Sequence, residues 1–167
     1  MRYKVDREEN VPMDINHKAP EFTLPDQNGE SISLKDFRGK YVVLYFYPRA
    51  DTPGCTVEAC EFRDAYKRFA SQKTVLLGVS PDSSARHDKF IAKLGLPFSL
   101  VADENHQIAE AYGVWKEKSM YGRKYMGVER STFIIGPEGR IRTVFRKVKP
   151  AGHAAEVLSA LASRTVG

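Results

Sequence analysis

The feature that most constrains the fold of this chain is an unbroken apolar run, YVVLYFY, at residues 41–47. A run without alternating polar residues is typical of a central strand that is buried on both faces of a sheet. Shorter runs at residues 75–79, 98–101 and 132–135 predict further strands. The chain must therefore supply other elements that cover both faces of this sheet.

Those covering elements are predicted by apolar residues that recur at helical spacing between and after the strands. Three stripes carry the pattern: Ala59, Phe62, Tyr66 and Phe69; His87, Phe90, Ile91 and Leu94; and Ala154, Val157, Leu158 and Leu161. A shorter helix is expected at residues 107–112. Strands that alternate with helices in this way predict an α/β sheet covered on both sides.

Turn sequences and length indicate how the chain is divided. Residues 26–29 (DQNG) lie between two short strand patterns and predict an N-terminal hairpin. Residues 136–139 (GPEG) predict a turn that leads into a strand at 140–145. For a chain of 167 residues without an internal linker, we predict an N-terminal arm at 1–16 and a single domain at 17–165.

The charge pattern argues against a nucleic-acid or membrane partner. The chain has 26 Lys and Arg against 21 Asp and Glu, a net charge of +5, but the two signs are interleaved along the sequence. It contains no clustered basic patch with interleaved aromatic residues and no apolar stretch of membrane-spanning length. Its first ten residues are charged and lack the apolar core of a secretory signal, so we expect a cytoplasmic protein.

The two cysteines, Cys55 and Cys60, are clustered five residues apart. A secreted disulfide scaffold would usually carry more cysteines, spread along the chain. A zinc site would need two further Cys or His ligands at compact spacing. The four histidines form no such pair: His17, His87, His106 and His153. The cysteine pattern therefore favours redox chemistry over a metal site.

The segment before Cys55 has the pattern of a helix start directly after the central strand. Thr52 suits the N-cap and Pro53 the first helical position, which places Cys55 in the first turn. Unpaired backbone N–H groups and the helix dipole there favour a negative charge, and the thiolate is the nucleophilic form of cysteine. A buried, inert cysteine is the alternative. The helix-start placement and the second cysteine favour the reactive interpretation.

The two sulfurs are predicted to face different directions on this helix. Cys55 lies on the apolar stripe that includes Ala59 and Phe62, whereas Cys60 is rotated from Cys55 by about 140°. In an intact helix their Cα atoms would be roughly 8–9 Å apart, beyond the reach of a disulfide, which needs less than about 7 Å. The spacing suits a two-stage reaction in which Cys55 is oxidised first and Cys60 is brought to it after the helix start unwinds.

The sequence around Cys55 resembles that of a known family. Pro48, Thr52 and Cys55 match the P-x-x-x-T-x-x-C signature of the peroxiredoxins. The longer run YFYPRADTPGCTVEACEFRD and a second block, YGVWKEKSMYGRKYMGVERSTFII, resemble the bacterioferritin-comigratory-protein, or peroxiredoxin Q, subgroup. The resemblance extends from about His17 to the final helix and implies a thioredoxin-like fold with a central mixed sheet.

The resemblance also implies an activity and its partners. Cys55 would be the peroxidatic cysteine, which reduces hydrogen peroxide or an organic hydroperoxide and becomes a sulfenic acid. Cys60 would be the resolving cysteine of an intramolecular disulfide, which thioredoxin or a similar dithiol would reduce. No metal or organic cofactor is required. Because both cysteines lie in one chain, we expect a monomer or at most a weak dimer.

Four further residues receive roles from the resemblance. Thr52 would hydrogen-bond the sulfur and the peroxide, and Pro48 would wall the pocket. Arg130 would hold the thiolate and the transition state, and Glu58 would orient that network. Each of three has a plainer alternative that the sequence leaves open: Pro48 as a strand end, Thr52 as a helix cap alone, and Arg130 in a surface ion pair.

The sequence leaves two other classes of function open. A general disulfide reductase or isomerase would be expected to carry C-x-x-C, and the C-x4-C spacing argues against it. A binding or chaperone-like module with a redox switch would need an apolar surface that is exposed when the disulfide forms. Consumption of peroxide at many equivalents per chain separates the peroxidase from both.

Overall fold

The computed structural model describes residues 15–166, and its centre is a five-stranded mixed sheet. The strand order is β5-β4-β3-β8-β9, with β3 and β5 both parallel to β4 and with β8 antiparallel to its two neighbours. The bounds are β3 (Tyr41–Phe46), β4 (Thr74–Ser80), β5 (Ser99–Ala102), β8 (Ser131–Ile135) and β9 (Ile141–Phe145). The predicted α/β class and mixed central sheet are confirmed.

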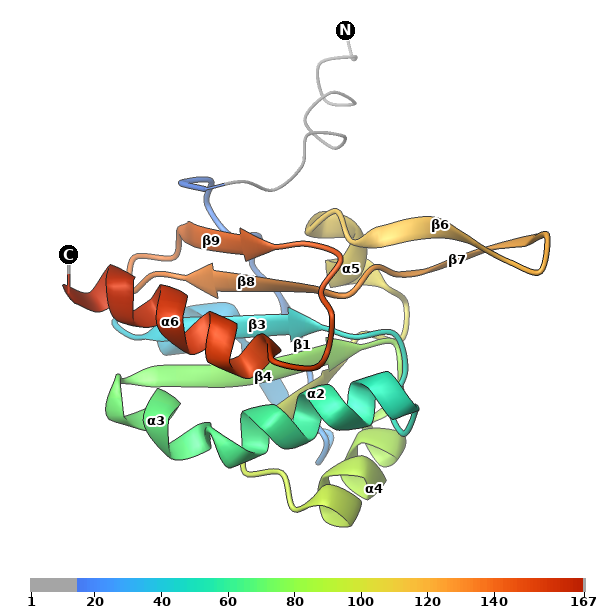
Figure 1. Cartoon of the computed structure of the whole chain (residues 1–167), viewed down its shortest axis with the longest axis horizontal. Helices are drawn as coiled ribbons and strands as arrows, with labels where there is room; N and C mark the ends of the chain where they lie inside the picture. Colours follow the sequence, from blue (N-terminus) through green and yellow to red (C-terminus); the bar gives the residue numbers. More distant parts are fainter. Residues whose placement is uncertain (1–14, 167) are drawn as a thin grey trace, which may run out of the picture.

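Both faces of the sheet are covered, as the apolar run in β3 requires (Figure 1). One face packs against α2 (Pro53–Asp64), α3 (Tyr66–Ser71), α4 (Ser84–Leu94) and α6 (His153–Val166). The other packs against α5 (Gln107–Ala111), the 3-10 helix η1 (Leu34–Phe37) and the hairpin of β1 (Thr23–Pro25) and β2 (Ser31–Ser33). Along β3, Val43 and Tyr45 belong to the first core and Leu44 and Phe46 to the second. This alternation explains why the strand has no polar position.

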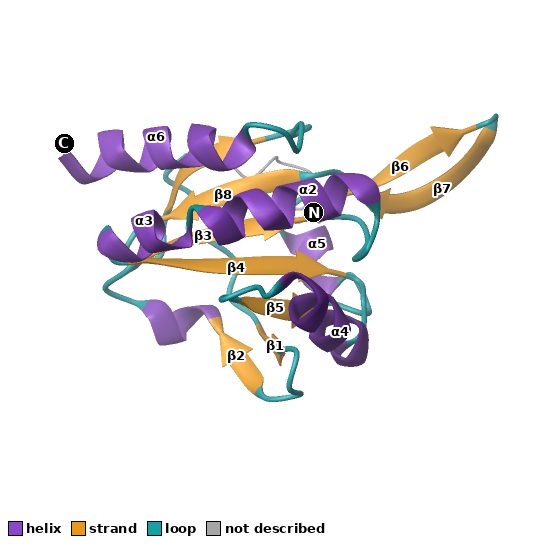
Figure 2. Cartoon of the chain, turned by 60° about the horizontal axis from the view of Figure 1, so that its bottom comes forward, coloured by secondary structure: helices purple, strands orange, loops and turns teal. Residues whose placement is uncertain are grey.

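Two local features differ from the sequence-based expectation. The first helical stripe is divided between α2 and α3 at Ala65, although Phe62 and Phe69 both remain fully buried. The strands β6 (Trp115–Met120) and β7 (Arg123–Val128) form a hairpin that projects from the body (Figure 2). No strand was predicted there, because most residues of this hairpin are solvent-exposed and its sequence lacks apolar alternation.

The topology brings several chain segments to one end of the sheet. β3 and β4 are parallel, so their carboxyl ends meet where α2 begins. α4 and the β6–β7 hairpin lie at the same end (Figure 1). Loops at the carboxyl ends of parallel strands are the usual place for a functional site. Of the predicted arm at 1–16, residues 1–14 lie outside the described part of the chain.

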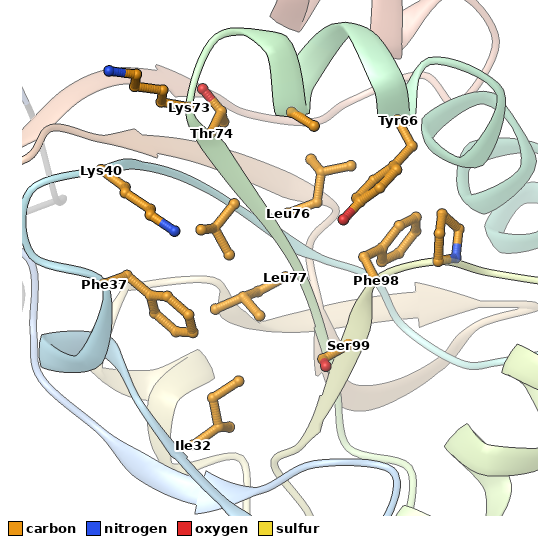
Figure 3. A pocket seen from close by; sticks show the side chains of 13 residues that line it. Ile32, Phe37, Lys40, Tyr66, Lys73, Thr74, Leu76, Leu77, Phe98 and Ser99 are labelled. Atoms are coloured by element: carbon orange, nitrogen blue, oxygen red, sulfur yellow. The ribbon is translucent and has the colours of Figure 1, made fainter.

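A cleft of about 420 Å³ lies at the opposite end of β4 (Figure 3). Phe37, Leu77 and Phe98 are among its apolar lining residues, and Lys40 stands at its side. Neither cysteine lines this cleft, so it is not part of the site described next. Within the described residues, no helix is long and apolar enough to cross a membrane.

Candidate active site

Helix α2 begins where the sequence predicted. Thr52 is the N-cap with extended backbone, Pro53 is the first helical residue, and Cys55 is the third. The carbonyl of Thr52 accepts the first helical hydrogen bond, from the N–H of Thr56 at 2.9 Å. The Cys55 side chain is buried, with 2% of the residue exposed. Its sulfur thus lies in the turn whose backbone N–H groups have no partner within the helix.

Arg130, between β7 and β8, reaches this turn from a distant part of the sequence. Its Nη2 donates to Cys55 Sγ at 3.5 Å and its Nη1 donates to Glu58 Oε1 at 2.7 Å. The Arg130 side chain is 14% exposed and that of Glu58 is fully buried. The surface ion pair considered for Arg130 is therefore wrong. The guanidinium instead joins the sulfur and a buried carboxylate.

Glu58 is an unusual charge partner because it is so thoroughly buried. Its second carboxyl oxygen, Oε2, makes no hydrogen bond. Burial raises the pKa of Glu58 to about 7, and the neighbouring Arg130 charge opposes the rise. The carboxyl group therefore changes charge near neutral pH, and with it changes how much of the Arg130 charge is balanced.

Gly54 makes room for the guanidinium. A Cβ atom at this position would lie 3.1 Å from Arg130 Nη2 and 3.4 Å from Pro150 Cγ. Any larger residue would press on the group that contacts Cys55. The sequence alone gives no sign of this close approach, because Arg130 is distant along the chain.

Pro48 and Thr52 belong to the segment that joins β3 to α2. The Thr52 hydroxyl donates to the carbonyl of Arg49 at 2.8 Å rather than to the Cys55 sulfur. The hydroxyl proton is therefore already in a hydrogen bond, whereas the hydroxyl oxygen can still accept one. Pro48 is half-buried immediately after the central strand. A wall of the pocket formed by Pro48 remains a prediction.

Cys60 lies on the same helix as Cys55, and both thiols are free. It is half-buried, in contrast to the buried Cys55. The residues that follow it hold the helix to its neighbours. Glu61 accepts hydrogen bonds from the Gly152 N–H on both carboxylate oxygens, at 2.9 and 3.1 Å. Arg63 Nη1 donates to the carbonyl of Leu94 at 2.7 Å.

A second cation near the centre was not identified from the sequence. Lys118, on β6, is half-buried, and burial followed by the nearby Arg130 charge lowers the pKa of Lys118. It was missed because it belongs to the hairpin that gave no strand pattern. Among residues 15–166, no three His, Cys, Asp or Glu side chains gather in a way that could hold a metal ion.

Comparison with known sequences gives consistent matches across most of the chain. A family model described as the AhpC/TSA family matches residues 15–144. Peroxiredoxin Bcp of Bacillus subtilis (strain 168) is 52% identical over 151 residues, which cover 90% of this chain and 96% of that relative. Peroxiredoxin Bcp of Escherichia coli (strain K12) is 43% identical over 148 residues, covering 89% and 95%.

Solved structures agree with these matches. A cysteine-to-serine mutant of Xylella fastidiosa PrxQ superimposes with a TM-score of 0.88 at 39% identity, covering 92% of this chain and 98% of that one. Xanthomonas campestris bacterioferritin comigratory protein, studied for its alkyl peroxide reduction activity, gives a TM-score of 0.83 at 42% identity, covering 86% and 92%. The predicted thioredoxin-like fold is confirmed by these neighbours.

Proposed function

This chain belongs to the AhpC/TSA family, as a peroxiredoxin of the Bcp/PrxQ group, and we propose that it reduces hydroperoxides with Cys55 as nucleophile and Cys60 as resolving thiol. One observation supports the proposal above all others. The Cys55 sulfur is buried in the first turn of a helix, 3.5 Å from the Arg130 guanidinium. Both the helix N-terminus and the guanidinium favour a thiolate there.

The first step is a two-electron transfer from sulfur to peroxide. The Cys55 thiolate attacks the distal peroxide oxygen, an S–O bond forms, and the O–O bond breaks. The leaving alkoxide or hydroxide takes a proton and departs as alcohol or water, and Cys55 becomes a sulfenic acid. Arg130 and the N–H groups of the first turn are donors placed where negative charge moves during this step.

The second step joins the two cysteines. The Cys60 thiol attacks the Cys55 sulfur, an S–S bond forms, and the sulfenic oxygen leaves as water. On the folded helix the two Cα atoms are roughly 8–9 Å apart, too far for a disulfide. The turns of α2 before Cys60 must therefore unwind for the bond to form.

The remaining parts of the proposal concern partners and surroundings. An external dithiol such as thioredoxin reduces the Cys55–Cys60 disulfide and returns the enzyme to its starting state. The substrates are hydrogen peroxide and organic hydroperoxides. The enzyme acts as a monomer, because each chain carries both thiols that the reaction needs. It acts in the cytoplasm, whose reducing environment keeps both thiols free.

The test is peroxide consumption with dithiothreitol or thioredoxin plus its reductase as electron source. We expect many equivalents of hydrogen peroxide or cumene hydroperoxide to be consumed per chain. Consumption of one equivalent or less would contradict the peroxidase. The oxidised protein should run as a monomer on a non-reducing gel, and disulfide-linked dimers as the main species would contradict the intramolecular bond.

A further inference from the structure

One peptide unit in the loop before α2 is held on both sides. The N–H of Ala50 donates to Asp82 Oδ2 at 2.7 Å. The carbonyl of Arg49 accepts from the Thr52 hydroxyl at 2.8 Å. These two groups belong to the same planar peptide unit. Whatever fixes the direction of the N–H therefore also fixes the direction of the carbonyl from which Thr52 takes its orientation.

Asp82 is itself held firmly and lies at the carboxyl end of β4. It is buried, and its Oδ2 also accepts from the Ser80 hydroxyl at 2.6 Å. Its Oδ1 accepts from Arg86 Nε at 2.9 Å. Burial opposes ionisation, but the hydrogen bonds from Ser80, the Ala50 N–H and Arg86 lower the pKa of Asp82. The group is therefore a carboxylate whose two oxygens have different, fixed partners.

A buried histidine completes the support of this carboxylate. The Ser80 hydroxyl has one proton, which it gives to Asp82, so the contact of 2.7 Å between Ser80 Oγ and His87 Nε2 has the imidazole as donor. Burial lowers the pKa of His87 to about 4, and a neutral ring with its proton on Nε2 fits this arrangement. From the sequence, His87 had no role beyond its place in a helical stripe.

We propose that Asp82 is a positioning residue for the peroxidase reaction, which acts through the Arg49–Ala50 peptide to orient the Thr52 hydroxyl beside Cys55. With its proton given to Arg49, the Thr52 oxygen is left as an acceptor, and it suits the O–H of a bound hydroperoxide. A carboxylate on the N–H side polarises the peptide and makes its carbonyl a stronger acceptor. This inference rests on the proposed function.

The test is Asp82→Asn in the full-length chain, with the rate of Cys55 oxidation by hydrogen peroxide as readout. Asparagine offers one carbonyl oxygen and one NH₂ group, so it cannot accept from both Ala50 and Arg86. We expect a rate about 10-fold lower, the size of one well-placed hydrogen bond. The pH at which the rate is half-maximal should not change, because Arg130 and its contact with the sulfur remain in place.

A double-mutant cycle separates positioning from a general structural effect. In a Thr52→Val background the hydroxyl is gone, so Asp82→Asn should cause no further loss of rate. If Asp82→Asn lowers the rate equally with and without the Thr52 hydroxyl, the positioning role is overturned. No loss in the wild-type background would overturn it too.

Asp51→Asn is the matched control, because it makes the same exchange on the loop itself. The Asp51 carboxylate pairs with Lys93 at 2.7 Å, and both side chains are more than half exposed. We expect a rate within about 2-fold of wild type, since exposed ion pairs contribute little. A loss as large as that of Asp82→Asn would overturn the proposal by showing that any disturbance of the loop suffices.

Ser80→Ala serves if Asp82→Asn does not fold. It removes a donor to Asp82 Oδ2 and leaves the carboxylate present, so a smaller loss of rate, about 3-fold, is expected only where Thr52 is intact. A loss that is the same without the hydroxyl would overturn the proposal. A wild-type protein that does not consume peroxide would instead contradict the proposed function, and this is measured before any variant.

Discussion

The two halves of helix α2 differ in what holds them in place. In the first half, Cys55 and Glu58 both contact the Arg130 guanidinium, and the contact with Cys55 depends on the charge of the sulfur. In the second half, Glu61 and Arg63 bind backbone groups of Gly152 and Leu94, and Phe62 is fully buried. Oxidation of Cys55 removes its negative charge and affects none of the second set. The reaction itself is therefore expected to loosen only the half that must move.

The largest expected effect separates the two cysteines. Cys55→Ser should abolish turnover, a loss of about 1000-fold or more, because Cys55 is the thiol in the first turn beside Arg130. Cys60→Ser should still reduce one equivalent of peroxide and then stop as a sulfenic acid, which further peroxide converts to sulfinic acid. Single-turnover kinetics and intact-protein mass spectrometry check both outcomes. Near-normal turnover in Cys55→Ser would remove the basis of the assignment.

The next prediction compares Arg130, which contacts the first half of α2, with Arg63, which joins the second half of α2 to Leu94. Arg130→Met should lower the rate of Cys55 oxidation by about 100-fold, because a donor to the transition-state charge is lost. Arg63→Met, which removes the contact with Leu94, should leave that rate within about 3-fold of wild type. Similar rates for the two variants would contradict the comparison.

Glu58 provides a pH-dependent test within the first half. Its pKa is raised from the ordinary 4.5 to about 7 in the folded protein. Between these values the folded state binds a proton that the unfolded state does not, so this group's contribution to stability falls as pH rises. His87 and His153, whose pKa values burial lowers, act in the opposite sense.

The measurement is urea unfolding of wild type and Glu58→Gln at about pH 5 and pH 7. The wild type should lose about 1–3 kcal/mol relative to the variant between these two pH values. The histidine contributions are common to both proteins and cancel in the difference. A difference that stays constant with pH would show that the Glu58 carboxylate is already ionised at the lower pH.

The smallest effect concerns the second half alone. Glu61→Gln removes a negative charge that accepts the Gly152 N–H just before α6. We expect a loss of about 0.3–1 kcal/mol in unfolding free energy, the usual size of a charge at a helix N-terminus, with an unchanged rate of peroxide reaction. Thermal unfolding and single-turnover kinetics measure the two quantities. A large fall in the rate would mean that the two halves are coupled before oxidation.

The parts of the fold that the sequence predicted are those with strong local patterns. Residues 41–47 indicated the central strand, and Thr52 with Pro53 indicated the start of α2. The β6–β7 hairpin escaped prediction because little of it is buried, so no apolar periodicity marks it. The periodicity of apolar residues indicates which side chains are buried, so it does not mark an element that packs against few others.

The candidate site was predicted only where a motif was present. Arg130 and Glu58 are 72 residues apart, and no spacing rule joins them; the resemblance to a family supplied both. Asp82 belongs to neither of the two sequence blocks that carry that resemblance, and its bond to Ala50 exists only because β3 and β4 end side by side. Contacts between segments that are distant in the sequence can be identified only from the folded structure.

The central claim is that oxidation unwinds the first half of α2 and spares the second. Amide hydrogen exchange of the reduced and the oxidised wild type, with the Cys55–Cys60 disulfide confirmed by mass, tests it most directly. We predict that the amides of residues 56–60 lose protection on oxidation, while the N–H groups of Ala65 and Phe69, which bond to the carbonyls of Glu61 and Ala65, retain it. Equal protection of residues 56–60 in the two states would contradict the account.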